Sequence, residues 1–373
     1  MRFRASRLLF LLCGFLYGSV KAQNSIEFSP LSGISVFSPG HLLLTGKSYG
    51  AELGYNFSMQ QNPADWVKRL NIDAVGVTAG YRNMSQVLVK DSIGSKGFLG
   101  NVYTLSGKLN ISLLKFKRTS LLLTPGAGIT YSTSSFFTDG NPIVASRINF
   151  SPQFGLKIKT PLSASTSLIT GANLFHYSNI ALRVPNNGVN SFEVSLGLVK
   201  ELKSFPQLKD SRINDDHVRS FFEFGADIGR RGSFKSYAGN WKSGLYLGYN
   251  YKLNPTISLK LAADAVYYYS VFDGSKNSDQ YFATSFDPWR FGMSAGADVW
   301  LGEVAVTTSY GYYFKFDGPY DIKTYWHAGL KYYFNSWLGI QGKGYVHKVQ
   351  ADYLGFGLIF RFGQKNNLAP TVN

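Results

Sequence analysis

The sequence predicts an all-β fold, an antiparallel transmembrane β-barrel of the outer membrane, and three observations support this prediction. The chain contains 24 Tyr, 29 Phe and 39 Gly, while only 16% of its residues are charged. After residue 22 it has no run of about 18 apolar residues, which excludes membrane-spanning helices. Segments of about ten residues instead alternate apolar and polar positions, as barrel strands do. A secreted soluble β-sandwich is the alternative, but that fold rarely carries so much Tyr and Phe.

The first 22 residues have the features of a secretory signal peptide. Three arginines precede the apolar run Leu8–Leu16, and Val20-Lys21-Ala22 places a small residue at the expected cleavage position. Cleavage there leaves Gln23 at the start of the mature chain. The single cysteine, Cys13, lies within the signal, and Leu12 before it disfavours a lipoprotein site. We therefore expect no disulfide and no cysteine metal site in the mature chain.

The basic charge of the chain suggests an anionic neighbour. The net charge is +16, and removal of the four basic residues of the signal peptide lowers it to +12. Phosphorylated lipopolysaccharide is the expected neighbour of an outer-membrane barrel, and it accounts for this charge more simply than nucleic acid does. Solvated lysines in loops also explain much of the same excess.

Strand candidates fall into two sets of eight, separated by turn residues. The first set lies near residues 26–36, 47–58, 70–83, 99–116, 118–132, 146–160, 164–179 and 189–201. The second set lies near residues 219–230, 242–253, 256–270, 287–300, 302–315, 320–334, 336–347 and 350–362. The predicted organisation is a signal peptide (1–22), a first barrel half (23–202), a polar connector (203–218), a second barrel half (219–363) and a C-terminal tail (364–373).

The two halves resemble each other, which suggests duplication of an eight-strand unit. The segment Leu53–Phe57 (LGYNF) is echoed by Leu247–Tyr251 (LGYNY). Duplication allows one fused barrel of about 14–16 strands or two tandem eight-stranded barrels. We favour the fused form because it leaves no exposed edges. An even number of strands puts both termini on the periplasmic side, so the strand that ends near Ser178 ends at the outer leaflet.

Polar residues in the stretch 174–194 could form a hydrolytic site. In the strand 189–201, alternation places Asn190 on a mostly apolar, lipid-facing side and Glu193 on the lumenal side. The preceding strand mixes apolar and polar residues on both faces, so parity leaves its lipid-facing side open. His176 and Ser178 nevertheless share one face of that strand. Their Cα atoms are then about 6–7 Å apart, close enough for the imidazole to reach the hydroxyl.

The segment HYSNIALRVPNNG, residues 176–188, resembles the signature of the lipid A deacylase family. This family comprises PagL-type 3-O-deacylases, and longer relatives are described as acyloxyacyl hydrolases. In the family, His-x-Ser-Asn is followed by Pro-Asn-x-Gly, on the lipid-facing side of the last two strands of an eight-stranded barrel. The resemblance implies that His176 is a general base and that Ser178 attacks an acyl ester of lipid A. It also implies that Asn179, Asn186 and Gly188 surround an oxyanion-binding loop.

The chain departs from the family pattern at the acid. The family has a Glu two residues after the loop glycine, and this position is Asn190 here. An amide oxygen can accept the imidazole N–H and fix its tautomer, as Asn does in Cys-His-Asn sites. It stabilises imidazolium less than a carboxylate does, so we expect slower turnover. Asn190 is therefore assigned the orienting role, with Glu193 in reserve. The resemblance is tight over 176–188, looser over 23–201, and does not cover the second half.

Other motifs carry less weight. Gly46–Gly50 fits the G-x-S-x-G string, but another strand follows where that nucleophile elbow requires a helix. In the corresponding hairpin of the second half, His347 and Asp352 occur, but Val349 stands where a serine is needed. This is a degenerate copy or a set of ordinary strand residues. The remaining histidines lack metal-ligand spacing, so no metal site is expected.

The function that the resemblance implies is hydrolysis of an ester-linked acyl chain of lipid A by a Ser-His mechanism without a cofactor. The chain would then be a carboxylic ester hydrolase of the outer membrane, with lipopolysaccharide as substrate and no nucleic-acid partner. The alternative is a non-catalytic barrel, a pore or a structural protein with a vestigial motif. A lumen rich in charged residues, with an open conductance, would favour the pore. The acyl position that is cut and the oligomeric state stay open.

Overall fold

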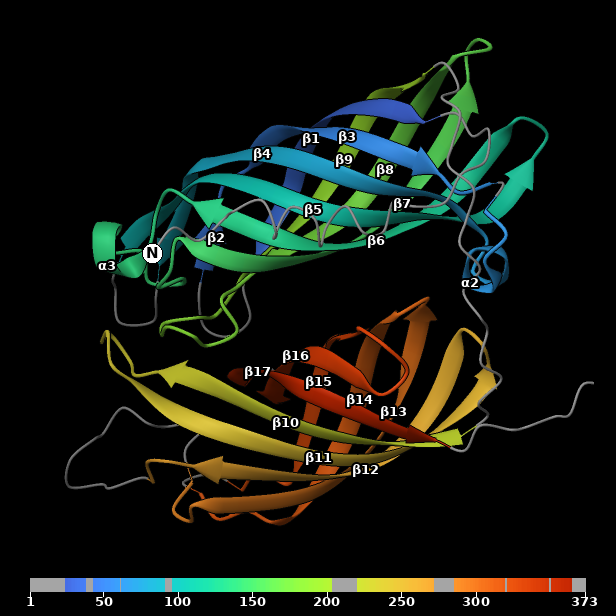
Figure 1. The fold of residues 1–373 in the computed structure, drawn as a ribbon. Helices are drawn as coiled ribbons and strands as arrows, with labels where there is room; N and C mark the ends of the chain where they lie inside the picture. Colours follow the sequence, from blue (N-terminus) through green and yellow to red (C-terminus); the bar gives the residue numbers. More distant parts are fainter. Residues whose placement is uncertain are drawn as a thin grey trace, which may run out of the picture.

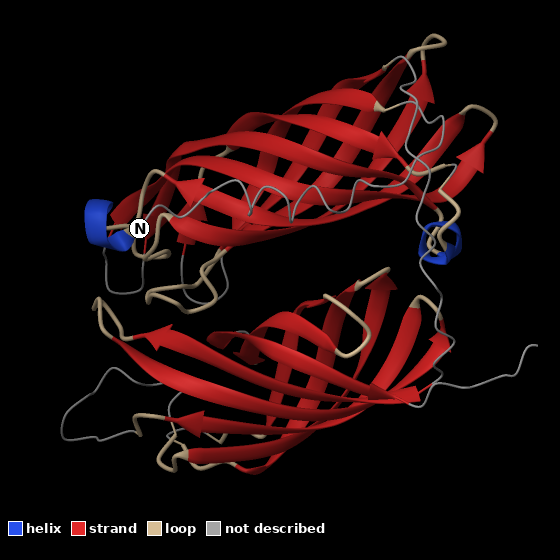
Figure 2. Ribbon diagram, viewed as in Figure 1, coloured by secondary structure: helices blue, strands red, loops and turns tan. Residues whose placement is uncertain are grey.

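The structure is a computed structural model that describes residues 24–37, 43–60, 62–90, 96–202, 220–271, 285–318, 321–348 and 350–363. The predicted signal peptide, connector and C-terminal tail lie outside these residues. Strands make up nearly all of the described chain, and two short helices lie between strands (Figure 2). No helix in these ranges combines the length and hydropathy needed to cross a membrane.

The first barrel is built from the strands of the first half. Its strands are β1 (Ser25–Phe37), β3 (Ser48–Ser58), β4 (Ile72–Lys90), β5 (Lys96–Phe116), β6 (Thr119–Ser132), β7 (Ile148–Pro161), β8 (Thr166–Tyr177) and β9 (Val189–Glu201). All pairs are antiparallel, and β1 closes the barrel against β9 with Ser25 opposite Glu201. The sequence did not predict the short strand β2 (Leu43–Thr45), which pairs with an extension of β4, or the helices α2 (Asp65–Arg69) and α3 (Phe136–Asp139).

The second barrel is built in the same way from the second half. Its strands are β10 (Ser220–Gly232), β11 (Gly239–Asn254), β12 (Ile257–Tyr268), β13 (Trp289–Leu301), β14 (Val304–Lys315), β15 (Thr324–Tyr333), β16 (Leu338–His347) and β17 (Gln350–Gly363). The strands β10 and β17 pair and close this barrel, with Phe221 opposite Gly363.

The fused barrel that we favoured is wrong, and the alternative of two tandem eight-stranded barrels is confirmed. In a fused barrel β1 would pair with the last strand of the second half. Here β1 pairs with β9 and β10 pairs with β17, so each half satisfies its own edge strands. The two barrels lie side by side (Figure 1).

Large apolar side chains cover the outside of both barrels. In the first barrel, Leu105, Ile129 and Leu196 are 55%, 58% and 58% exposed, and in the second, Leu247 and Leu261 are 55% and 63% exposed. Charged and polar side chains fill both interiors. An apolar exterior around a polar interior is the arrangement of a transmembrane β-barrel, so the predicted fold class is confirmed.

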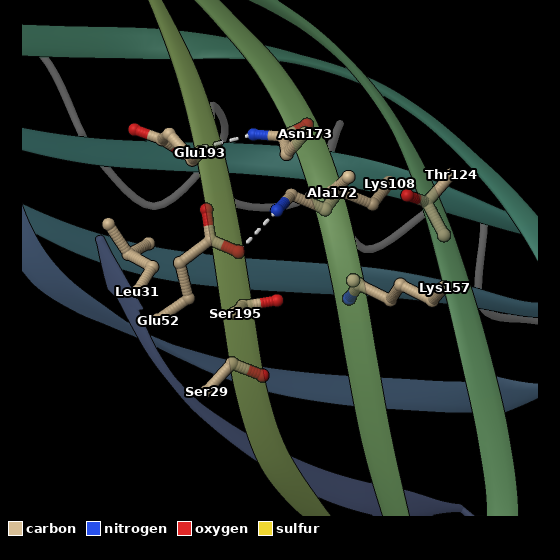
Figure 3. Close-up of a pocket in the computed structure, with 11 residues that line it drawn as sticks. Ser29, Leu31, Glu52, Lys108, Thr124, Lys157, Ala172, Asn173, Glu193 and Ser195 are labelled. Carbon is tan, nitrogen blue, oxygen red and sulfur yellow. Dashed lines mark hydrogen bonds and ion pairs between the residues drawn. The ribbon is translucent and has the colours of Figure 1, made fainter. Parts of the chain in front are cut away.

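Paired charges cross the interior of the first barrel. The buried Arg82 of β4 forms ion pairs with Glu193 of β9 (2.6 Å) and with Glu52 of β3 (2.9 Å). Lys108 of β5 pairs with the other oxygen of Glu52 at 2.5 Å. A cavity lined by Glu52, Lys108, Glu193 and Lys157, among others, has a volume of about 20 Å³ (Figure 3). That is room for about one water molecule.

An apolar cluster fills the interior where β8 ends and β9 begins. Its members are Val36, Met84, Val87, Val89, Leu99, Val102, Ile143, Val144, Phe175, Tyr177 and Val189. Phe175 and Tyr177 flank His176 in sequence and point inward. Burial of each large side chain contributes about 1.5–3 kcal/mol. The cluster therefore fixes the backbone of both strands directly beneath their outer surface.

Candidate active site on the outer face of the first barrel

The structure decides which face of β8 points outward. Leu174 is 47% exposed and Phe175 is 1% exposed, so the even-numbered residues of β8, His176 among them, lie on the outer surface. In β9, Leu196 and Leu198 are exposed and Glu193 is 1% exposed, which confirms the faces predicted for that strand.

Three of the predicted site residues meet on this outer surface. His176 lies opposite Asn190 in the β8–β9 register, and its Nδ1 is 2.9 Å from Asn190 Oδ1. The other ring nitrogen, Nε2, is 3.0 Å from Ser178 Oγ. If Nδ1–H donates to the amide oxygen, Nε2 carries a lone pair and can accept the hydroxyl proton of Ser178. The geometry is that of a nucleophile, a base and a group that orients the base.

The backbone of Ser178 is held by the neighbouring strand β7. Ser178 N–H donates to Phe150 O (3.0 Å), and Phe150 N–H donates to Ser178 O (2.8 Å). This pair extends the β7–β8 ladder past Tyr177, the last residue of β8. Ser178 therefore keeps the strand alternation and projects on the same face as His176.

Two asparagines fasten the loop that follows the serine. The Asn179 N–H donates to Asn186 Oδ1 (2.9 Å), which ties the start of the loop to its end. The buried side chain of Asn179 donates to Ser146 Oγ (2.7 Å) in the β6–β7 connection. That connection also receives the loop backbone, because Ala145 N–H donates to Pro185 O (2.9 Å). The loop residues 179–188, here called the site loop, are thus held on the side of the first barrel.

Gly188 lies against the imidazole. Its φ is +68°, in the left-handed region that favours glycine. A Cβ at this position would lie 2.6 Å from His176 Cε1 and 3.5 Å from Ser178 Cβ. The ring of His176 therefore occupies the space that any side chain at residue 188 would need.

The reserve carboxylate does not join this group. Glu193 points into the lumen and binds Arg82 through both of its oxygens (2.6 and 2.9 Å), and it also accepts from Asn173 (3.1 Å). In the described ranges, no group of three His, Cys, Asp or Glu side chains is arranged to hold a metal ion. No sequence motif pointed to Ser146 or Phe150, because both contacts depend on pairing between segments distant in the chain.

The matching hairpin of the second barrel carries its histidine on the inside. His347 ends β16, is 3% exposed, and its Nε2 lies 2.9 Å from Arg290 Nη1 and 2.8 Å from Tyr313 Oη. Arg290 also forms an ion pair with Asp352 (2.7 Å). These residues form a polar network in the lumen and have no access to the outer surface.

Two family models match the chain. The model described as lipid A 3-O-deacylase (PagL) matches residues 49–199, and the model described as acyloxyacyl hydrolase, C-terminal domain, matches residues 220–366. No curated protein matches the chain.

Among solved structures, that of the outer membrane enzyme PagL is similar at 18% identity and a TM-score of 0.29, over 48% of this chain and 99% of that chain. The NanC porin is similar at 9% identity and a TM-score of 0.17, over 92% of this chain and 100% of that chain. OccK5 (OpdH) of Pseudomonas aeruginosa is similar at 12% identity and a TM-score of 0.24, over 94% and 98% of the two chains. Because the two family matches together span most of its length, the chain belongs to the family of lipid A 3-O-deacylases (PagL) with an acyloxyacyl hydrolase C-terminal domain.

Proposed function

We propose that this protein hydrolyses an ester-linked acyl chain of lipid A in the outer membrane, with Ser178 as nucleophile, His176 as general base and Asn190 as the group that orients the imidazole. The observation that carries the proposal is the pair of contacts of His176, at 2.9 Å to Asn190 and 3.0 Å to Ser178. Membership in the deacylase family supports the class of substrate.

The chemistry follows the usual course of a serine hydrolase. Ser178 Oγ attacks the ester carbonyl while His176 Nε2 takes the hydroxyl proton, and negative charge develops on the carbonyl oxygen. His176 then returns the proton to the alcohol oxygen of the ester as the bond between this oxygen and the acyl carbon breaks. Water, activated by the same imidazole, hydrolyses the acyl-enzyme and releases the fatty acid. Asn190 holds the ring so that Nε2 faces the serine.

The site loop is proposed to stabilise the oxyanion. In the proposed roles, Asn179 and Asn186 fasten the loop through their mutual hydrogen bond. Gly188 brings the backbone close to Ser178, where no side chain would fit. In this role, backbone N–H groups of the loop point at the carbonyl oxygen of the ester. They stabilise the transition state more than the bound ester, because the negative charge on this oxygen grows during the reaction.

The position of the site suits a substrate that is itself part of the membrane. The site lies on the outer surface, at the end of the barrel opposite Ser25 and Glu201. The start of β1 and the end of β9 are expected on the periplasmic side, so the end of the barrel that carries the site lies in the outer leaflet, where lipid A resides. A lipid can then reach Ser178 by lateral diffusion, and the lumen takes no part in catalysis.

A pore is disfavoured by the interior of the first barrel. Its charged side chains pair with one another across the lumen, and the cavity lined by Glu52, Lys108 and Glu193 has a volume of only about 20 Å³. An ion or solute would have to break these buried pairs to pass, at a cost of several kcal/mol each.

Fatty-acid release from lipid A tests the proposal. The purified full-length protein is incubated with vesicles that contain lipid A, and both lipid A and free fatty acid are measured by mass spectrometry. We expect wild type to remove one acyl chain, and Ser178→Ala and His176→Ala to remove none above background. Thr170→Ala is the matched control, because Thr170 is exposed on the same outer face of β8. No release by wild type, or equal release by Ser178→Ala, contradicts the proposal.

A further inference from the structure

The site loop contains a strained turn directly after the proposed nucleophile. Ile180 and Ala181 both have positive φ values, +50° and +62°. L-residues with a Cβ rarely adopt this region, and β-branched residues such as isoleucine least of all. Such a conformation persists only where surrounding contacts over-determine it. Contacts within the first barrel hold Asn179, Pro185 and Asn187, which lie on either side of the turn.

The turn is closed by its own hydrogen bond from Leu182 N–H to Asn179 O (3.1 Å), and the second barrel adds further contacts. Ala181 O accepts a hydrogen bond from Gly232 N–H (2.8 Å), and Val184 O accepts one from Lys235 N–H (3.0 Å). Val184 and Phe234 also form a parallel β-bridge. The hairpin that joins β10 and β11, residues 232–238, thus adds a strand-like edge to the site loop. Both lie at the same end of the two barrels (Figure 1).

Side chains reinforce this backbone contact. The rings of Phe137 in α3 and Tyr237 in the hairpin stack with centroids 4.3 Å apart. The guanidinium of Arg183, in the site loop, lies 4.6 Å from the Tyr237 centroid and 5.6 Å from that of Phe137. Cation–π contacts of this kind are stabilising when they are partly desolvated. The Cγ2 methyl of Ile180 also packs close to Gly344 of β16.

We infer that the second barrel is a positioning device for the active site, and that its hairpin 232–238 holds the strained turn so that Ser178 and the site loop keep their catalytic geometry. This inference rests on the proposed function. Gly232, Arg183 and Tyr237 are positioning residues in this arrangement. They act through the loop and do not touch the reacting atoms.

Gly232 offers a sharp test of this inference. A Cβ there would lie 2.6 Å from Arg183 Cα and 3.0 Å from Leu182 O, both backbone atoms of the site loop. Gly232→Ala therefore adds one methyl group that pushes the loop away from the second barrel. Gly107→Ala is the matched control, because a Cβ at Gly107 on β5 meets nothing within 4 Å.

The experiment measures kcat and KM on lipid A vesicles, the rate at which a fluorophosphonate labels the serine, and thermal unfolding, all on full-length protein. We expect Gly232→Ala to lower kcat and the labelling rate about tenfold to a hundredfold, because small misplacements of catalytic groups have effects of this size. KM and the unfolding temperature should change little. Tyr237→Ala should have the same effect, and it provides the test if Gly232→Ala fails to fold. Tyr237→Phe keeps the ring and should therefore be as active as wild type.

The outcomes separate this inference from the proposed function. If wild type is active and Gly232→Ala and Tyr237→Ala label and turn over at the rate of Gly107→Ala, the positioning role is overturned. If Tyr237→Phe is as slow as Tyr237→Ala, the ring contact is not the cause and the inference also fails. If wild type itself neither releases fatty acid nor reacts with the probe, the proposed function is the part that fails.

Discussion

The hairpins β8–β9 and β16–β17 occupy equivalent places in the two barrels, yet the histidine of one points outward and the histidine of the other points into the lumen. In the first barrel, His176 lies on the outer surface and contacts Ser178 and Asn190. In the second, His347 is buried in the lumen against Arg290 and Tyr313. The strands of the first hairpin are joined by the long site loop, whereas in the second hairpin His347 pairs directly with Gln350.

This difference shows what a β-barrel needs in order to carry a site on its surface. Alternation decides whether a side chain meets lipid or lumen, so a shift of one residue moves a histidine from one to the other. An outward histidine also needs partners within reach, and here the loop returns the chain so that Gly188 and Asn190 meet the ring. The second barrel has neither feature and instead supports the loop of the first.

The largest expected effect comes from the outward histidine. His176→Gln removes the base and should lower fatty-acid release about a thousandfold or more, as in other sites whose members act as a unit. Rates of release from lipid A vesicles measure this. Activity within tenfold of wild type would mean that His176 is an ordinary interfacial residue.

A smaller loss is expected at the glycine that the ring contacts. Gly188→Ala places a methyl group 2.6 Å from His176 Cε1 and should lower kcat about tenfold to a hundredfold. Gly140→Ala is the control, because Gly140 has the same φ of +68° but nothing within 4 Å of its Cβ position. Equal kcat values for the two variants would show that contact between residue 188 and the imidazole does not limit activity.

Substitutions of Asn190 should have moderate effects that differ in sign. Asn190→Leu removes the acceptor for His176 Nδ1 and should lower kcat about five- to tenfold, since one hydrogen bond contributes about 1 kcal/mol. Asn190→Glu supplies a carboxylate at the same place and should give equal or higher activity. Steady-state rates on lipid A test both, and a loss in Asn190→Glu argues against the orienting role.

The smallest effect on activity is expected at the inward histidine. His347→Ala should leave fatty-acid release unchanged, because the ring lies in the lumen of the other barrel. It should lower the free energy of unfolding by about 1–3 kcal/mol, since the buried Arg290 and Tyr313 each lose a hydrogen-bond partner. Denaturant unfolding and the lipid A assay together test this. A loss of activity without a loss of stability would indicate a second functional centre.

Much of the fold could be predicted from the sequence, because strand alternation is a local property. The strands of both halves, the lumenal side of Glu193 and the outer side of Asn190 follow from period-two patterns alone. The face of β8 could not be read in this way, since Leu174 and Phe175 are both apolar and only packing shows which of them is buried.

What the sequence could not predict depends on contacts between distant segments. The alternation pattern of a strand does not determine its partner. It therefore could not show whether β1 closes a barrel with β9 or with the last strand of the chain. The contact between Ser146 and Asn179, and the docking of hairpin 232–238 on the site loop, likewise join segments with no shared motif. The cluster of His176, Ser178 and Asn190 could be predicted from the sequence, because two of its members are two residues apart on one strand and the third follows the loop glycine.

The most direct measurement is covalent trapping of the nucleophile. Full-length wild type and His176→Ala are treated with a fluorophosphonate, and the modified peptide is identified by mass spectrometry. An exterior hydrolytic site predicts one adduct on wild type, at Ser178, and a rate of labelling at least about a hundredfold lower in His176→Ala. An adduct at another residue, or equal labelling of Ser178 in both proteins, would contradict it.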